Sequence, residues 1–168
     1  MEGVGLVESK VFQDNRGSFV KLINSHQIKG ANFGTLKEVF FSKSHSGVVR
    51  GMHLQIGEAS SHRIISVLEG LAFDVLLDLR PTSSTFLSMK TIILDANLSQ
   101  SLLVPPGVAH GFQAQRTVTM LYLSDKEYSP QHDLGINPLT LDIAWPEPIT
   151  AISDRDLALP RLEDFLHL

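Results

Sequence analysis

The sequence of 168 residues has no cysteine, one tryptophan and two tyrosines. The lack of cysteine excludes disulfide bonds, thiolate metal sites and a cysteine nucleophile. No apolar run approaches the roughly 18 residues of a membrane span, and the start, MEGVGLVESK, lacks the basic end and apolar centre of a secretion signal. We therefore expect a cytoplasmic protein that has no contact with membranes.

The charged residues show no excess of positive charge, because 14 Lys and Arg stand against 18 Asp and Glu and give a formal net charge of −4. This balance offers no general surface for nucleic acid, so we expect no nucleic-acid partner. A negative net charge is still compatible with a local basic pocket for one diphosphate, because the net charge does not determine the charge inside a single cleft. Repeats and low-complexity tracts are also lacking, which predicts a single domain over residues 1–168.

Long helical patterns are scarce, and short apolar runs separated by Gly, Pro, Asn and Ser dominate instead. Such runs are typical of an all-β barrel or sandwich. The runs predict strands over residues 6–12, 19–23, 36–42, 63–68, 71–79, 86–94, 100–104 and 118–123. Turn chemistry is predicted at residues 14–17 and, as a hairpin between two strands, at Glu69–Gly70. Residues 25–30 fit a short helical or coil link, and residues 153–165 fit short helices.

Two sequence blocks each supply a histidine. In RGMHLQ (residues 50–55), alternation along a strand places His53 and Gln55 on one face and the apolar Met52 and Leu54 on the other. The second block, PPGVAHGF (residues 105–112), turns at its prolines and delivers His110. This spacing resembles the two blocks of cupin barrels, in which a histidine from each block faces the interior. The resemblance implies an all-β fold, the cupin double-stranded β-helix (jelly-roll barrel), with N-terminal strands and short C-terminal helices.

Nearly the whole sequence resembles one cupin family, the dTDP-4-dehydrorhamnose 3,5-epimerases of deoxysugar biosynthesis. The shared segments, specific only as an ordered set, are DNRGSF (14–19), RGMHLQ (50–55), DVLLDLR (74–80), PPGVAHGF (105–112), Tyr122, YSP (128–130), IAWP (143–146) and ISDRD (152–156). The resemblance implies an epimerase that inverts C3, C5 or both in a nucleoside-diphosphate 4-keto-6-deoxyhexose without a cofactor. It also implies a homodimer, in which the segment around Arg16 and Phe19 reaches the nucleotide site of the neighbouring subunit.

The resemblance assigns catalytic roles to four residues. His53 removes the proton beside the ketone, Asp156 orients His53, and Tyr122 returns a proton from the opposite face. Arg63 takes the place of a lysine that stabilises the enolate. The expected substrate-binding residues are Arg16, Phe19, Lys21, Glu38, Arg50, Gln55, His110 and Tyr128, with Asp74 supporting His110.

Elementary chemistry suits these roles. Removal of a proton beside a carbonyl needs a base that titrates near neutral pH, which imidazole provides, and a carboxylate fixes its tautomer. An enolate needs a cation at its oxygen, and a phenol, with an ordinary pKa near ~10, keeps a proton to donate. The residues alone do not choose between Asp154 and Asp156, because Ser153–x–x–Asp156 also fits a capping box at a helix start.

Several positions depart from the family pattern. Lys21 replaces a glutamate, Glu38 and Phe40 replace a glutamine and an asparagine, and Arg63 replaces the lysine. These changes leave open the nucleotide base, the exact sugar and the carbons inverted. Gln55 occupies the position of the second histidine of a metal-binding His–x–His pair, so no metal is expected. The alternatives are a ketoisomerase on the same class of sugar, a cupin that binds a sugar nucleotide without catalysis and, third, a metal-dependent oxygenase.

Overall fold

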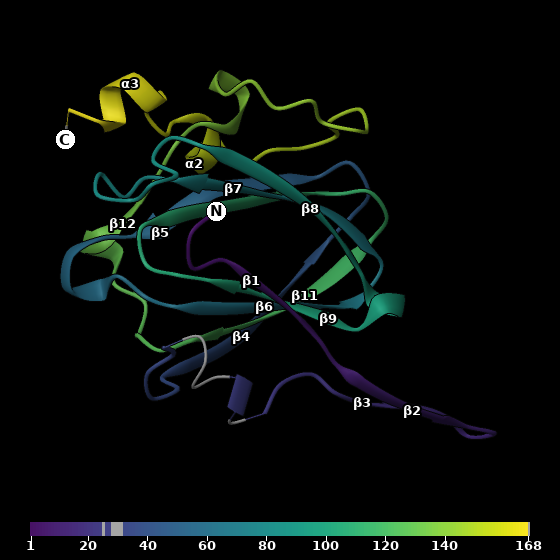
Figure 1. Ribbon diagram of the computed structural model, residues 1–168. Coiled ribbons are helices and arrows are strands. Elements are labelled where there is room, and N and C mark those ends of the chain that lie inside the picture. Colours follow the sequence, from purple (N-terminus) through teal and green to yellow (C-terminus); the bar gives the residue numbers. More distant parts are fainter. Residues whose placement is uncertain (25, 28–31, 168) are drawn as a thin grey trace.

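The computed structural model describes residues 1–24, 26–27 and 32–167, and within them β-strands are the main regular structure (Figure 1). The strands are β1 (Gly5–Glu8), β2 (Lys10–Asp14), β3 (Gly17–Lys21), β4 (Glu38–Ser44), β5 (Val49–Gln55), β6 (Arg63–Glu69), β7 (Leu71–Asp78), β8 (Met89–Asp95), β9 (Gln100–Val104), β10 (Val108–Ala114), β11 (Val118–Ser124) and β12 (Asp133–Gly135). The short helices are α2 (Asp154–Leu157) and α3 (Leu162–Phe165), with 3₁₀ turns at Gly57–Ala59, Ala96–Leu98, Pro130–His132 and Pro138–Thr140. In the described part of the chain, no helix is long and apolar enough to cross a membrane.

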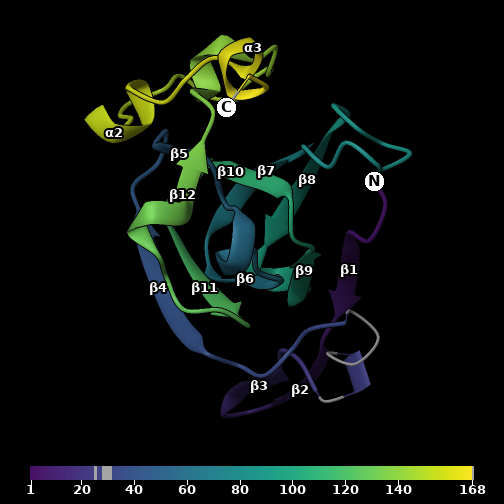
Figure 2. The same cartoon turned by 90° about the vertical axis from the view of Figure 1, so that its left-hand side faces the viewer.

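Two antiparallel five-stranded sheets form the barrel. Their strand orders are β1-β9-β6-β11-β4 and β12-β5-β10-β7-β8, and Figure 2 shows the sheets curving around a shared interior. Buried apolar side chains from both sheets fill this interior, among them Ile65, Leu76, Leu102, Phe112 and Met120. The prediction of an all-β jelly-roll barrel is confirmed.

The outer face of the second sheet is covered by the C-terminal segment, which lies over β7 in Figure 1. Met52 and Leu54 of β5 are buried in this outer core, where Phe73 also meets Trp145 edge to face at 6.0 Å. Because alternate residues of a strand face opposite ways, covering Met52 and Leu54 turns His53 toward the barrel interior. The predicted facing of β5 is confirmed.

One end of the interior is apolar, and the other end carries polar side chains on the same strands. On β6, Ile65 and Val67 belong to the interior core, so Arg63, two residues before Ile65, faces the same interior at the start of the strand. On β10, Phe112 is in this core and His110 is two residues before it. The alternation of each strand therefore builds a polar pocket directly beside the apolar core.

Three local predictions were wrong. The expected strand over residues 6–12 is split at Ser9, whose amide donates to Ser99 O at 2.9 Å, so that β1 pairs with β9 and β2 pairs with β3. Glu69–Gly70 is a corner rather than a hairpin, because β6 and β7 belong to different sheets. Gly70 has φ +87°, and a side chain there would meet Thr117 O at 2.1 Å.

The strand expected over residues 86–94 begins later, at Met89, because the preceding turn folds around Asp78. The hydroxyls of Ser83 and Thr85 donate to the Asp78 carboxylate at 2.7 and 2.6 Å, and the Leu87 amide donates to Asp78 O. The expected link over residues 25–30 falls mostly outside the described residues. The short helices expected over residues 153–165 are present as α2 and α3.

A two-stranded ribbon, β2 and β3, projects away from the barrel (Figure 1). The predicted turn at residues 14–17 is confirmed, since Asp14 pairs with Gly17 at the tip. Almost every residue of the ribbon is exposed, including Phe12 and Phe19, whose rings lie 6.0 Å apart. An isolated two-stranded ribbon is at best marginally stable in water. Burial of Phe12 and Phe19 against another surface would therefore stabilise the ribbon.

Candidate active site

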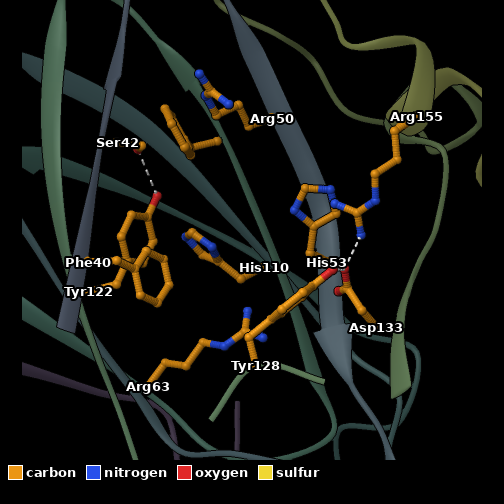
Figure 3. Close-up of a pocket in the computed structure, with 11 residues that line it drawn as sticks. Phe40, Ser42, Arg50, His53, Arg63, His110, Tyr122, Tyr128, Asp133 and Arg155 are labelled. Carbon is orange, nitrogen blue, oxygen red and sulfur yellow. Dashed lines mark hydrogen bonds and ion pairs between the residues drawn. The ribbon is translucent and has the colours of Figure 1, made fainter. Parts of the chain in front are cut away.

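The polar end of the barrel holds a pocket of about 240 Å³ to which both sheets contribute (Figure 3). Its lining consists of Phe40, Ser42, Arg50, His53, Arg63, His110, Phe112, Tyr122, Tyr128, Asp133 and Arg155. The volume lies below the ~300–1,000 Å³ of pockets for drug-sized ligands. The pocket therefore suits a single sugar ring better than a whole sugar nucleotide.

His53 is held by a carboxylate from the C-terminal segment. Ser153 caps helix α2 by accepting a hydrogen bond from the Asp156 amide, and Asp156 Oδ1 lies 2.7 Å from His53 Nε2. Asp156 Oδ2 accepts a second hydrogen bond from the Gly51 amide at 3.2 Å. Burial raises the pKa of Asp156, but the hydrogen bond and charge of His53 outweigh burial and leave that pKa below its ordinary value. Of the two aspartates at the helix start, the structure brings Asp156, and not Asp154, to His53.

His110 forms a second, deeper pair with a carboxylate. β10 pairs with β5 so that His110 lies opposite His53, and with β7 so that its ring reaches Asp74. The His110 Nε2 to Asp74 Oδ2 distance is 2.8 Å, and the His110 side chain is 6% exposed against 26% for His53. Complete burial raises the pKa of Asp74, against the opposing charge of His110.

Tyr122 lies across the pocket from His53, with His110 between them (Figure 3). Its ring stacks on Phe40 of the neighbouring strand β4, with centroids 4.8 Å apart and planes 9° from parallel. The Tyr122 hydroxyl lies 3.4 Å from Ser42 Oγ. Burial raises the pKa of Tyr122 to about 12, partly opposed by the hydrogen bond with Ser42. The phenol therefore keeps its proton at neutral pH.

Three arginines line the pocket. Arg50 Nε donates to Ser44 Oγ at 2.8 Å, and Arg155 pairs with Asp133 at 2.5 Å. Among the described residues, none makes a hydrogen bond or ion pair to the Arg63 guanidinium. Burial lowers the pKa of Arg63, opposed by the nearby charge of Asp133, but a guanidinium remains protonated in proteins. The pocket thus contains a cation free to bind an anionic or developing negative oxygen.

The structure does not bring every expected residue into this pocket. Arg16, Phe19 and Lys21 belong to the projecting ribbon, where Arg16 pairs with Asp14 at 2.6 Å. Glu38 is half-buried at the start of β4 and does not line the pocket.

Gln55 also lies outside the pocket lining, because its amide is bonded to backbone. Its Oε1 accepts from the Ser129 amide at 2.6 Å, and its Nε2 donates to Ala59 O and Glu127 O. These bonds hold the segment that carries Tyr128. Tyr128 itself lines the pocket mouth and donates its hydroxyl to Asp133 at 3.0 Å.

Five lining residues were not among the expected site residues: Phe40, which the sequence marked only as a departure from the family pattern, Ser42, Phe112, Asp133 and Arg155. Alternation along β4 places Ser42 on the same inward face as Phe40, so the sequence could have indicated Ser42. Arg155 directly precedes Asp156, so its position in the sequence could also have indicated it. Asp133 gave none, since it is close only through the pairing of β12 with β5. Within the described ranges, no three histidine, aspartate or glutamate side chains gather in an arrangement that would hold a metal ion.

Comparisons with known proteins agree with this geometry. The family model described as dTDP-4-dehydrorhamnose 3,5-epimerase matches residues 1–164. An Escherichia coli protein of that name is 32% identical, with 100% of this chain and 94% of that protein covered. The crystal structure of a dTDP-4-dehydrorhamnose 3,5-epimerase from Sulfolobus tokodaii superposes with a TM-score of 0.90 at 36% identity, covering 97% and 92% of the two chains. A 3'-monoepimerase from Streptomyces bikiniensis, in complex with dTDP-quinovose, gives a TM-score of 0.87 at 29% identity, covering 96% and 85%.

Proposed function

The chain belongs to the dTDP-4-dehydrorhamnose 3,5-epimerase family, and from this premise we propose that it inverts C3, C5 or both of a nucleoside-diphosphate 4-keto-6-deoxyhexose through an enolate. The observation that carries the proposal is that His53 and Tyr122 line one pocket from opposite sheets. Inversion of a carbon needs a base on one face of the ring and a proton donor on the other.

His53 is the base in this proposal. With Nε2 held by Asp156, the Nε2 proton is donated to the carboxylate, and Nδ1 keeps the lone pair that receives the proton from the sugar. The ionised Asp156, whose pKa is lowered, stabilises the imidazolium that forms. The 26% exposure of the His53 side chain gives substrate access to the ring.

Tyr122 is the proton donor, and Arg63 stabilises the enolate. Burial raises the pKa of Tyr122 to about 12, so the phenol stays protonated until it transfers the proton to the strongly basic carbon of the enolate. Arg63 has no carboxylate partner bonded to it among the described residues, so its donors are available to the ketone oxygen as negative charge develops there. Each role uses a side chain that the fold already aims into the pocket.

The nucleotide is expected to lie outside the small pocket, between two subunits. Arg16, Phe19 and Lys21 of the projecting ribbon offer two cations and an aromatic ring, which suit a diphosphate and a base. A homodimer in which each ribbon reaches its neighbour's pocket would cover the exposed Phe19. It would also cover Phe41, which is 70% exposed on the edge strand β4.

Solvent exchange tests the proposal. The protein is incubated in deuterated water with dTDP-4-keto-6-deoxyglucose and with the GDP and CDP analogues, and NMR follows C3 and C5. We expect deuterium at one or both carbons, with the ketone still at C4. A ketone that moves would indicate a ketoisomerase, and saturable binding without exchange would indicate a binding protein.

A matched pair of variants locates the base. His53→Asn should abolish exchange, whereas His62→Asn should retain it, because His62 also pairs with a carboxylate, Asp125 at 3.0 Å, but does not line the pocket. Full exchange by the folded His53→Asn protein would refute the assignment of the base.

A further inference from the structure

Ser42 lies beside the proposed proton donor. β4 pairs with β11 in a register that sets Phe40 opposite Tyr122 and Ser42 opposite Met120. Ser42 therefore faces the interior, and its hydroxyl lines the pocket 3.4 Å from the Tyr122 hydroxyl (Figure 3). Backbone pairing between two neighbouring strands fixes this contact.

The surroundings of the Tyr122 hydroxyl are poor in strong hydrogen-bond partners. Besides Ser42, the partner of the phenol within the described residues is Met120 Sδ at 3.6 Å, and a thioether accepts only weakly. The stacked ring of Phe40 excludes water from one face of the phenol. Ser42 thus provides the one side-chain hydroxyl among the described residues that lies within hydrogen-bond distance of the phenol oxygen.

Resting on the function proposed above, we propose that Ser42 is a positioning residue for Tyr122. Its hydroxyl donates to the phenol oxygen, which leaves the phenol proton directed to the sugar. In the transfer, the Tyr122 O–H bond breaks as the electron pair of the enolate forms the new C–H bond, and Ser42 holds the phenolate that remains. Water then returns a proton to the phenolate, His53 releases to water the proton that it took from the sugar, and both side chains are back in their starting states.

The electrostatics of the site agree with this arrangement. Burial raises the pKa of Tyr122, and the hydrogen bond from Ser42 lowers it. A phenolate in an apolar site is costly unless donors meet it. Loss of the Ser42 hydroxyl should therefore slow the step in which Tyr122 gives up its proton, while proton removal by His53 continues.

The test measures how the enolate is partitioned. In deuterated water, an enolate protonated from the Tyr122 side becomes inverted product, and one protonated again from the His53 side returns as deuterated substrate. We expect Ser42→Ala to lower the ratio of inverted product to deuterated substrate by about 10- to 100-fold, the scale of one hydrogen bond to a charged group. Ser42→Thr, which keeps a hydroxyl, should restore the ratio.

Ser44→Ala is the matched control, because Ser44 lies on the same face of β4 but bonds Arg50 rather than Tyr122. It should weaken substrate binding and leave the ratio unchanged. An unchanged ratio in Ser42→Ala overturns the inference. So does an equal loss of exchange and inversion, which would mean that Ser42 only supports the fold.

A titration separates failure of this inference from failure of the proposed function. The chain has two tyrosines, so in a Tyr128→Phe background the absorbance of tyrosinate reports Tyr122 alone. Ser42→Ala should raise the midpoint relative to the protein that keeps Ser42, and Ser44→Ala should not. A raised midpoint in a protein without any solvent exchange would refute the proposed function. An unchanged midpoint would overturn the role of Ser42 itself.

Discussion

Replacement of Asp156 by asparagine should disable His53 as the proposed base without changing the shape of the site. Both carboxylate oxygens of Asp156 accept hydrogen bonds, Oδ1 from His53 Nε2 at 2.7 Å and Oδ2 from the Gly51 amide at 3.2 Å. Asparagine has only one such oxygen. If that oxygen meets Gly51, the NH₂ group faces His53 Nε2 and forces the ring proton onto Nδ1, where the lone pair is needed.

The opposite orientation of the amide is no better. It places two donors, the NH₂ group and the Gly51 amide, against each other inside a buried site, and it removes the negative charge that stabilises the imidazolium. Since general base catalysis contributes about 10²- to 10⁴-fold, we expect kcat to fall by a factor in that range. This loss equals about 3–5 kcal/mol of transition-state stabilisation.

Asp154→Asn is the control for Asp156→Asn, because it makes the same change in charge two residues earlier in α2, at an exposed position. Single-turnover deuterium exchange and thermal unfolding are measured for both variants. We expect Asp156→Asn to lose exchange while it stays folded, and Asp154→Asn to behave like the unchanged protein. Exchange at the normal rate in Asp156→Asn would refute the argument from the tautomer of His53.

Three further predictions follow from other contacts. Tyr122→Phe should keep solvent exchange at the substrate carbon but lower inversion by about 10²- to 10⁴-fold, as NMR would show. Burial raises the pKa of Asp78, but hydrogen bonds from Arg80 and neighbouring hydroxyls bring that pKa well below its ordinary value. The ionised Asp78 therefore stabilises the fold above pH ~4, and this contribution is lost as the pH falls. Asp78→Asn should therefore lower the free energy of unfolding by about 3 kcal/mol at neutral pH, and urea titrations in increasingly acidic buffer should show that difference shrinking. Phe19→Ser should weaken dimerisation roughly tenfold or more in sedimentation equilibrium, whereas Leu98→Ser, at a similarly exposed site, should not.

The sequence predicted the facing of side chains better than the pairing of strands. The direction in which a side chain faces is local, because a period of two follows from strand geometry alone, and Met52 and Leu54 lie on the predicted face. Pairing depends on distant segments. Glu69–Gly70 has the residue types of a hairpin turn, yet β6 pairs with β9 and β11 rather than with β7. The local sequence does not distinguish a corner between two sheets from a hairpin.

The site was predicted where a residue type was unusual, and missed where only proximity matters. A histidine on the inner face of a strand, such as His53, is unusual enough to indicate a site. So is Arg63, which stands on the same face of β6 as the core residues Ile65 and Val67. An aspartate such as Asp133 is common on any surface, so only the pairing of β12 with β5 brings it to the pocket. Gln55 shows the converse, because an inward polar side chain can be occupied by backbone, as its 2.6 Å bond to the Ser129 amide shows.

Two histidines line the pocket, each paired with an aspartate behind it, and the electrostatics of the two pairs differ in a way that fits one proposed role to each. Asp156 has a lowered pKa and stays ionised at neutral pH, so it can stabilise a proton gained by His53, whose ring is partly exposed to the pocket. Asp74 is fully buried, and its raised pKa reflects a carboxylate that is costly to ionise. His110, nearly enclosed beside it, is suited to bind and orient the sugar. A base must gain and release a proton at every turnover, and of these two pairs, that of His53 and Asp156 combines access to the pocket with a stable negative charge.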